Sequence, residues 1–206
     1  MKYLARFSIV VIAAFILAAT ATPAQAASMK TANFISHFEG FSPCPYNDPA
    51  GHATIGYGHL LHYGKVTRKD RLTIPCLSKR QGRKLLRSDL RYYQSEVVQR
   101  IKGARVTAPM MTALVSFAYN LGPGLLDQRE SNGFTRRTRI ASHVVRGNYR
   151  IAVRQMRIYD GVIANGQRYE LPGLTRRRNT EAALFMRGVR QMASCKPQSC
   201  PGRVVR

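Results

Sequence analysis

Residues 38–59 constrain this chain more than any other stretch, because a turn and a short strand interrupt the helical patterns there. Before the turn, apolar residues recur at helical spacings of three and four, namely Phe34, Ile35, Phe38 and Phe41. Gly40 follows directly after Glu39, and a glycine in that place suits a left-handed helix stop. We therefore expect Glu39 to project from the end of a helix.

Two acids bracket the turn. With Phe38 and Phe41 beside it, the Glu39 carboxyl is expected to be partly desolvated, which favours the protonated form and suits a general acid. Asp48 lies in the sequence Tyr-Asn-Asp-Pro-Ala-Gly, a turn composition that keeps a side chain hydrated and ionised. Carboxyls in opposite protonation states are typical of acid–base hydrolysis, including that of glycosidic bonds. For an arbitrary pair of acids, a turn aspartate and a solvated helix-end glutamate are the commoner explanation.

The motif around these acids resembles that of the phage-type lysozymes of glycoside hydrolase family 24. Their pattern is Glu, then an acid nine positions on, then Thr-Ile-Gly-x-Gly-His, and Glu39, Asp48 and residues 54–59 match it. Residues 116–122 resemble the central buried helix of that family. Residues 173–178, together with Glu181, resemble its C-terminal arginine-rich helix. The resemblance extends over about residues 31–188, nearly the whole chain after its first apolar segment.

The resemblance implies an α+β, lysozyme-like fold that is mostly helical. A small β-hairpin lobe would be linked by a long helix to a helical lobe. It also implies hydrolysis of the β-1,4 bond between N-acetylmuramic acid and N-acetylglucosamine in peptidoglycan, without a cofactor. Glu39 would protonate the leaving oxygen, while Asp48 and Thr54 would position the attacking water. Inversion at the anomeric carbon follows from the resemblance, whereas retention needs a shorter distance between the carboxyls.

Five further positions have expected roles. By the resemblance, the substrate-binding residues are Leu60, Tyr119 and Asn120. His59 ends the motif, and Asp89 lies where the family places the partner of that histidine. We expect His59 and Asp89 to form a structural pair, in preference to a catalytic role for His59.

Helical patterns account for much of the remaining chain. Residues 78–81 form a capping box, and an apolar stripe from Leu86 to Ile101 predicts one long helix over about residues 79–101. Thr107 is expected to cap the next helix, whose residues 110–121 are apolar nearly all round and therefore buried. Further helices are predicted over residues 135–146, 149–158 and 174–189. Residues 160–173 are predicted to form an irregular loop, and the tail from residue 194 to be peripheral.

The N-terminus has the pattern of a cleavable signal peptide over residues 1–26. A charged start precedes an apolar run over residues 7–19, and Ala24 and Ala26 form an A-x-A cleavage site. The catalytic domain would then cover residues 27–193, followed by a tail rich in Cys, Pro and Arg over residues 194–206. We expect a periplasmic or secreted protein. The alternative is a retained signal-anchor.

The chain has four cysteines, and an even count in an exported protein suggests disulfides. Of the three possible pairings we favour Cys44 with Cys76, which ties the loop of the motif to the next helix, and Cys195 with Cys200. The alternative is a zinc site. The spacings do not suit zinc, because neither Cys44 nor Cys76 has a second cysteine close by. We expect no metal.

The formal net charge is +23, so the protein is attracted to polyanions. For an exported protein these are anionic envelope polymers rather than nucleic acid, beside the peptidoglycan strands themselves. The sequence indicates no specific protein partner, and we expect a monomer. Two other functions stay open: a cationic wall- or membrane-binding protein without essential hydrolysis, and a glycanase acting on chitin or chitosan. Wall opening for a secretion or flagellar apparatus, and lysis, both fit an exported muramidase.

Overall fold

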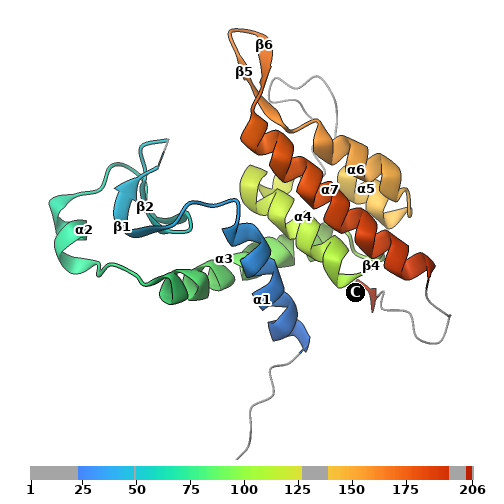
Figure 1. The fold of residues 1–206 in the computed structure, drawn as a ribbon, viewed down its shortest axis with the longest axis horizontal. Coiled ribbons are helices and arrows are strands. Elements are labelled where there is room, and N and C mark those ends of the chain that lie inside the picture. Colours follow the sequence, from blue (N-terminus) through green and yellow to red (C-terminus); the bar gives the residue numbers. More distant parts are fainter. Residues whose placement is uncertain (1–22, 49, 127–138, 195–202, 206) are drawn as a thin grey trace, which may run out of the picture.

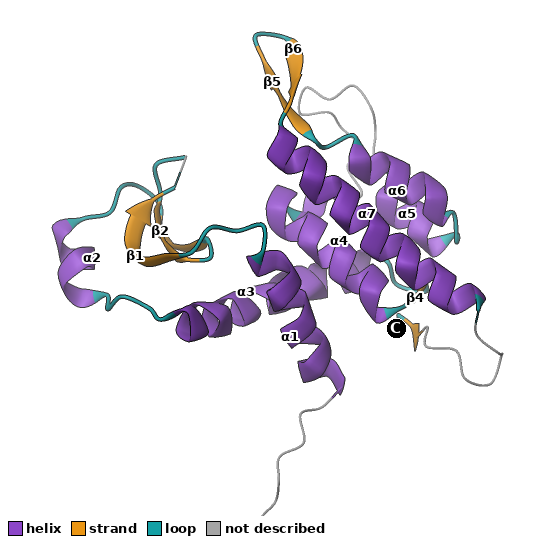
Figure 2. Ribbon diagram, viewed as in Figure 1, coloured by secondary structure: helices purple, strands orange, loops and turns teal. Residues whose placement is uncertain are grey.

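The long helix α3 (Lys79–Arg100) connects two lobes in the computed structural model of this chain (Figure 1). The structure describes residues 23–48, 50–126, 139–194 and 203–205. One lobe holds a small antiparallel sheet, and the other consists mainly of packed helices (Figure 2). The bounds of α3 agree with the predicted helix to within one residue.

The small lobe is built on a three-stranded antiparallel sheet in the order β1 (Ser42–Asn47), β2 (Ala53–Gly56), β3 (His59–His62). The register pairs Tyr46 with Thr54 and Thr54 with Leu60. The helix α2 (Arg68–Thr73) follows and has a capping box at its start. We define the small lobe as residues 42–76.

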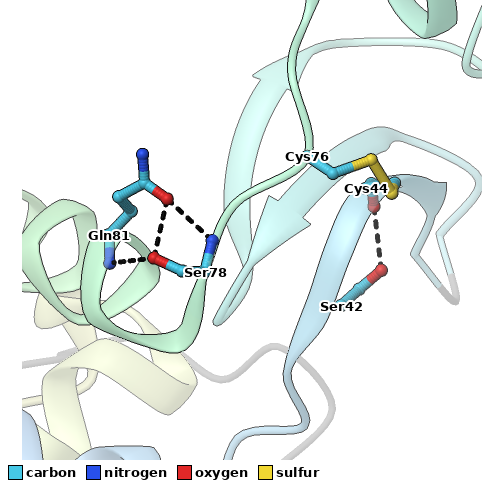
Figure 3. Close-up of a disulfide and its surroundings, with 5 residues drawn as sticks. All are labelled: Ser42, Cys44, Cys76, Ser78 and Gln81. Atoms are coloured by element: carbon cyan, nitrogen blue, oxygen red, sulfur yellow. Dashed lines mark hydrogen bonds between the residues drawn. A yellow bond between two sulfur atoms is a disulfide. The ribbon is translucent and has the colours of Figure 1, made fainter.

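The junction between the small lobe and α3 is held covalently. Cys44 on β1 is joined by a disulfide to Cys76, just before α3, with their Cα atoms 4.3 Å apart (Figure 3). Ser78 and Gln81 then form the predicted capping box, because each side chain bonds the backbone N–H of the other. Cys195 and Cys200 lie outside the described residues.

The helical lobe packs around α4 (Ala108–Leu121), whose residues 112–118 are all buried. The apolar nature of that helix predicted this burial. We define the helical lobe by its helices, which are α1 (Pro23–Ser36), α4, the 3-10 helix η1 (Pro123–Leu126), α5 (Ile140–Val145), α6 (Tyr149–Arg157) and α7 (Pro172–Ala193). Of these helices, α4 and α7 make the most extensive contact with each other.

The predicted helix stop at Gly40 is wrong. Helix α1 ends at Ser36, and Gly40 is not among the glycines with positive φ. His37 Nδ1 and Ser36 Oγ both contact the Asn33 carbonyl oxygen, at 2.6 and 2.9 Å. Side chains that bond nearby carbonyls in this way compete with the helical ladder, so the helix ends early. Glu39 therefore lies in the turn after α1.

Three other expectations need correction. Residues 160–173 hold a hairpin, β5 (Gly161–Ala164) paired with β6 (Gln167–Glu170), whose turn has positive φ at Asn165 and Gly166. Thr107 is the N-cap residue of α4 as predicted, but its side chain makes no capping bond, because its Oγ1 is buried facing Gly188. The predicted helix over residues 135–146 is described only from residue 139, and α5 begins at Ile140.

The end of the C-terminal tail is anchored rather than peripheral. The strand β4 (Arg105–Val106) pairs with β7 (Arg203–Val204), and the Val205 backbone bonds both Gly103 and Ala104. Within the described residues, no helix is long and apolar enough to cross a membrane. The apolar run at residues 7–19 lies outside them.

Candidate active site

A cleft of about 420 Å³ lies where the small lobe, α3 and α4 meet. It brings together six residues that the sequence proposed for the site. Asp48 and Thr54 are not part of its lining. The lining residues are Glu39, Gly58, His59, Leu60, Asp89, Tyr92, Tyr93, Tyr119 and Asn120.

Glu39 is paired with an arginine from the last long helix. Arg177 Nη1 on α7 donates a hydrogen bond to Glu39 Oε1 at 2.7 Å, and the Arg177 guanidinium lies 5.2 Å from the centre of the Phe38 ring. The Arg177 side chain is 4% exposed and that of Glu39 is 23% exposed. The sequence analysis predicted the phenylalanines beside Glu39 but missed Arg177. The guanidinium thus holds one of the two carboxylate oxygens of Glu39.

Arg177 is itself held by a buried polar cluster. Its Nε donates to Glu181 Oε1 at 3.2 Å, and Ser116 Oγ on α4 donates to the same oxygen at 2.6 Å. Burial raises the pKa of Glu181, and the neighbouring Arg178 cation and the Ser116 hydrogen bond oppose that rise. Glu181 and Ser116 therefore hold the Arg177 side chain in place. Through Arg177, α7 and α4 together set the position of Glu39.

Arg178 fixes a second lining residue. Its Nη2 donates to Asn120 Oδ1 at 2.9 Å and to Glu181 Oε1 at 3.1 Å. Its Nε lies 3.0 Å from Glu181 Oε2 in a geometry that makes no hydrogen bond, so that contact is electrostatic. Burial lowers the pKa of Arg178 to about 10. Consecutive arginines on α7 thus orient Glu39 and Asn120.

Asp48 lies in the turn between β1 and β2, and Thr54 lies on β2. Asp48 Oδ1 accepts a hydrogen bond from the His52 backbone N–H at 2.8 Å, so the carboxylate closes this turn. The Thr54 side chain is buried, and its hydroxyl donates to the His52 carbonyl oxygen at 3.1 Å. Both side chains thus bond the same residue of the loop.

Tyr46 relates this turn to Glu39. Burial raises the pKa of the Tyr46 phenol, and the negative charges of Asp48 and then Glu39 raise it further. The charges of both carboxylates therefore raise the pKa of the same phenol, which lies on β1, the strand directly before Asp48. The sequence analysis did not identify Tyr46, although its register opposite Thr54 follows from the hairpin.

His59 and Asp89 form a pair across the junction between the small lobe and α3. His59 Nδ1 lies 3.0 Å from both Asp89 carboxylate oxygens. Burial raises the pKa of Asp89, and the hydrogen bond from His59 opposes that rise. The contact joins β3 to α3, as expected for a structural pair.

Three tyrosines line one wall of the cleft. The rings of Tyr92 and Tyr93 are 5.2 Å apart in an edge-to-face arrangement, and those of Tyr93 and Tyr119 are 5.0 Å apart. The Tyr119 hydroxyl donates to the Tyr57 carbonyl oxygen at 2.8 Å, and burial raises the pKa of its phenol. The sequence analysis missed Tyr92 and placed Tyr93 only in an apolar stripe. The signal that could have found them is the absence of tryptophan, which leaves Tyr and Phe as sugar platforms.

Among the described residues, no group of three or more His, Cys, Asp or Glu side chains is arranged to hold a metal ion. The lining of the cleft combines Glu39, which has a fixed cation, with aromatic rings on the wall between α3 and α4, whereas Asp48 lies outside the lining, in the turn between β1 and β2.

Comparison with known proteins gives a consistent result. The family model described as phage lysozyme matches residues 36–181. The endolysin of Bacillus phage B103 is 31% identical over 160 residues, which are 76% of this chain and 52% of that protein. The endolysin of Acyrthosiphon pisum secondary endosymbiont phage 1 is 29% identical over 153 residues, 73% of this chain and 91% of that protein. The chain therefore spans about half the length of the first of these relatives.

Two solved structures have a similar fold. The muramidase domain of SpmX from Asticaccaulis excentricus matches with a TM-score of 0.61 at 28% identity, covering 76% of this chain and 95% of that domain. The endolysin from Escherichia coli O157:H7 phage FAHEc1 matches with a TM-score of 0.60 at 27% identity, covering 76% and 90%. These matches confirm the predicted lysozyme-like α+β fold.

Proposed function

Since this chain belongs to the phage lysozyme family, we propose that it is a glycoside hydrolase that cleaves the glycan strands of peptidoglycan. The bond cleaved is the β-1,4 linkage between N-acetylmuramic acid and N-acetylglucosamine. The observation that carries this proposal is the position of Glu39. It lies in the cleft between the lobes, and a nearly buried arginine bonds one of its two oxygens.

In this mechanism Glu39 is the general acid. Arg177 occupies Oε1, and Oε2 makes no hydrogen bond with a described residue, so Oε2 is the oxygen that carries the proton. A bound substrate would bring its glycosidic oxygen to Oε2. The proton then moves to the leaving oxygen as the glycosidic bond breaks.

Asp48 and Thr54 are proposed to act on the attacking water. Asp48 accepts a proton from the water as its oxygen bonds the anomeric carbon, and the Thr54 hydroxyl orients that water. This division of roles gives inversion of configuration. Following the anomer of the first product by NMR distinguishes the outcomes, and a first product with retained configuration contradicts the role of Asp48 as a base.

The cleft lining is proposed to bind the sugars. Leu60 presents an apolar side chain from β3, Asn120 offers an amide fixed by Arg178, and Tyr119 forms part of the aromatic wall. The N-acetyl groups and ring faces of peptidoglycan sugars suit this mixture of amide and aromatic groups. Anionic groups elsewhere in the envelope would be attracted by the net positive charge.

The test is muropeptide release from purified peptidoglycan by the wild type and by Glu39→Gln. General acid catalysis contributes about 10²–10⁴-fold, so we expect Glu39→Gln to lose roughly a thousandfold in rate. Glu170→Gln is the matched control, because it makes the same chemical change at an exposed carboxyl outside the cleft. Products with reducing muramic acid ends support hydrolysis, and anhydro ends would assign a lytic transglycosylase.

The two alternatives give different results in the same assay. Binding to the wall without release by either protein would support a cationic wall-binding protein. Faster release from chitin or chitosan than from peptidoglycan would support the other glycanase. Equal activity of Glu39→Gln and the wild type would exclude the proposed site.

We also propose export, with cleavage of residues 1–26 and a role in local wall opening or lysis. Such cleavage would remove the first four residues of α1, since the helix begins at Pro23. N-terminal sequencing of the protein from a periplasmic fraction tests this. A mature protein that begins at Met1 and stays with membranes would indicate a retained anchor instead.

A further inference from the structure

A second pocket, of about 480 Å³, lies between α6 and α7. None of its lining residues belongs to the cleft, and α6 lies on the side of the helical lobe away from the three-stranded sheet (Figure 1). Three of the five lining residues are arginines. We call it the α6–α7 pocket; it is lined by Arg150, Val153, Arg154, Arg157 and Met186.

The arginines form a row on one face of α6. Their spacings of four and three residues place Arg150, Arg154 and Arg157 above one another over about 10 Å of helix. All three are exposed, while Ala152, Val153 and Met156 of the same helix are buried. The face of α6 that the core does not use therefore carries guanidinium groups.

No carboxylate of the described structure neutralises this row. Arg150, Arg154 and Arg157 make no hydrogen bond or ion pair with a described residue. Helices α5 and α6 contain no acidic residue, and the one acid of α7, Glu181, is fully buried and paired with Arg177 and Arg178. Like charges this close repel one another, so the row is complementary to an external anion.

The floor of the pocket is apolar. Val153 is almost completely buried and Met186 is half-buried, and both lie among the arginines. Guanidinium groups match the oxygens of a phosphate, and a thioether and a valine match hydrocarbon. An anionic phospholipid offers phosphate in its headgroup and hydrocarbon in its acyl chains, whereas a polar phosphate polymer offers the phosphate alone.

We propose that the α6–α7 pocket binds the phosphate headgroups of an anionic phospholipid surface. The protein then rests on the membrane through α6, and the cleft on another part of the molecule stays open to glycan. This inference does not rest on the proposed hydrolysis, because no pocket residue lines the cleft.

The experiment measures cosedimentation of the full chain with phosphatidylcholine vesicles, with and without phosphatidylglycerol, at physiological ionic strength. The variant is Arg150→Gln/Arg154→Gln/Arg157→Gln. The matched control is Lys79→Gln/Arg80→Gln/Lys84→Gln, which removes three exposed cations from the start of α3. Residues 7–19 are apolar and are the same in every variant. For each variant, the binding to phosphatidylcholine vesicles is therefore subtracted from the binding to vesicles with phosphatidylglycerol, which removes any contribution of these residues.

We expect the arginine variant to bind anionic vesicles roughly a hundredfold more weakly, at about fivefold for each residue near the surface. The control should lose no more than a few-fold. Equal losses in both variants, or no preference of the wild type for anionic vesicles, would overturn the proposal. Unchanged muropeptide release by the arginine variant would show that the cleft is intact and that the two sites are separate.

Met186→Ser tests the apolar floor and separates a lipid from a free phosphate. We expect it to weaken vesicle binding several-fold and to leave the binding of pyrophosphate unchanged. Two results together would overturn the lipid assignment and indicate a phosphate site. One is that a low concentration of pyrophosphate abolishes the binding of the wild type to vesicles, and the other is that Met186→Ser binds the vesicles as well as the wild type does. This variant changes no charge, so it serves even where the triple substitution perturbs the fold.

Discussion

The small lobe and the helical lobe bury very different amounts of apolar side chain. In the small lobe the buried apolar side chains among the described residues are Pro45, Ala53, Ile55 and Tyr57, and the disulfide and capping bonds supplement them. In the helical lobe, residues 112–118 of α4 are all buried, and the core closes around charged residues. The small lobe therefore depends on individual cross-links, whereas the helical lobe depends on packing and on a buried cluster of paired charges.

The largest effect is expected from breaking that charge cluster. Glu181→Ala leaves the nearly buried guanidinium of Arg178 without a carboxylate and that of Arg177 with Glu39 alone. Removing one partner of a buried ion pair costs about 3–5 kcal/mol in the free energy of unfolding. Urea denaturation measures this loss. Glu170→Ala, which removes an exposed partner of Arg168, should change stability very little, and a similar loss in both variants would contradict the comparison.

A smaller and more local effect is expected from opening the small lobe. Cys44→Ser/Cys76→Ser removes a cross-link between residues 32 apart, which contributes about 2–4 kcal/mol. Hydrogen exchange should then show lost protection in β1, β2 and β3 and retained protection in α4 and α7. Uniform loss in both lobes would mean that they unfold as one unit.

The packing of Phe41 and Tyr57 against Gly82 on α3 is expected to matter less. A Cβ at Gly82 on α3 would lie 2.6 Å from the Phe41 ring, so Gly82→Ala should destabilise by about 1–3 kcal/mol through overpacking. Gly173→Ala in α7 is the control, because a Cβ there meets nothing within 4 Å. Thermal unfolding should show a lower midpoint for the first variant and an equal or higher one for the second.

The smallest effect is a pH dependence of the small lobe. The Tyr63 carbonyl, and then Asp70, raise the pKa of His62 above its ordinary 6.5. Hydrogen bonds from the Thr67 hydroxyl and backbone, and then from His62, lower the pKa of Asp70 from 3.8 to about 2. His62 Nε2 lies 3.0 Å from Asp70 Oδ2 and ties β3 to α2.

The stabilisation by His62 and that by Asp70 depend on pH in opposite directions. The His62 contribution is fully present below its unfolded pKa and is lost as pH rises through the raised folded value. The Asp70 contribution is present above its unfolded pKa and is lost as pH falls toward about 2. The gap in unfolding temperature between the wild type and His62→Gln should therefore be widest between about pH 4 and 6.5. A gap that is constant from acid to alkaline pH would exclude this pair.

Local signals predicted the elements that depend on neighbouring residues. The capping box at Ser78 and Gln81 and the apolar stripe gave α3 with its correct start. The phage lysozyme resemblance, carried by the motif from Glu39 to His59, is confirmed by the match to residues 36–181. The hairpin of β5 and β6 was missed although Asn165 and Gly166 are a strong turn signal. Its strands are almost wholly exposed, so no alternating apolar pattern marked them.

Contacts between distant segments could not be read from local patterns. Arg177 and Glu39 are 138 residues apart, and nothing near Glu39 in the sequence indicates a cation beside it. The pairing of β7 with β4 likewise brings the end of a tail rich in arginine and proline back to the core. Both contacts join segments far apart in the chain, so short windows of sequence do not contain them.

The bond between Arg177 and Glu39 also sets an order of events during biosynthesis. Glu39 leaves the ribosome early, whereas its guanidinium partner lies on α7, 138 residues later. A chain that ends before α7 carries the whole glutamate motif without its electrostatic partner. Under the proposed function, the completed site therefore exists only after α7 has been synthesised.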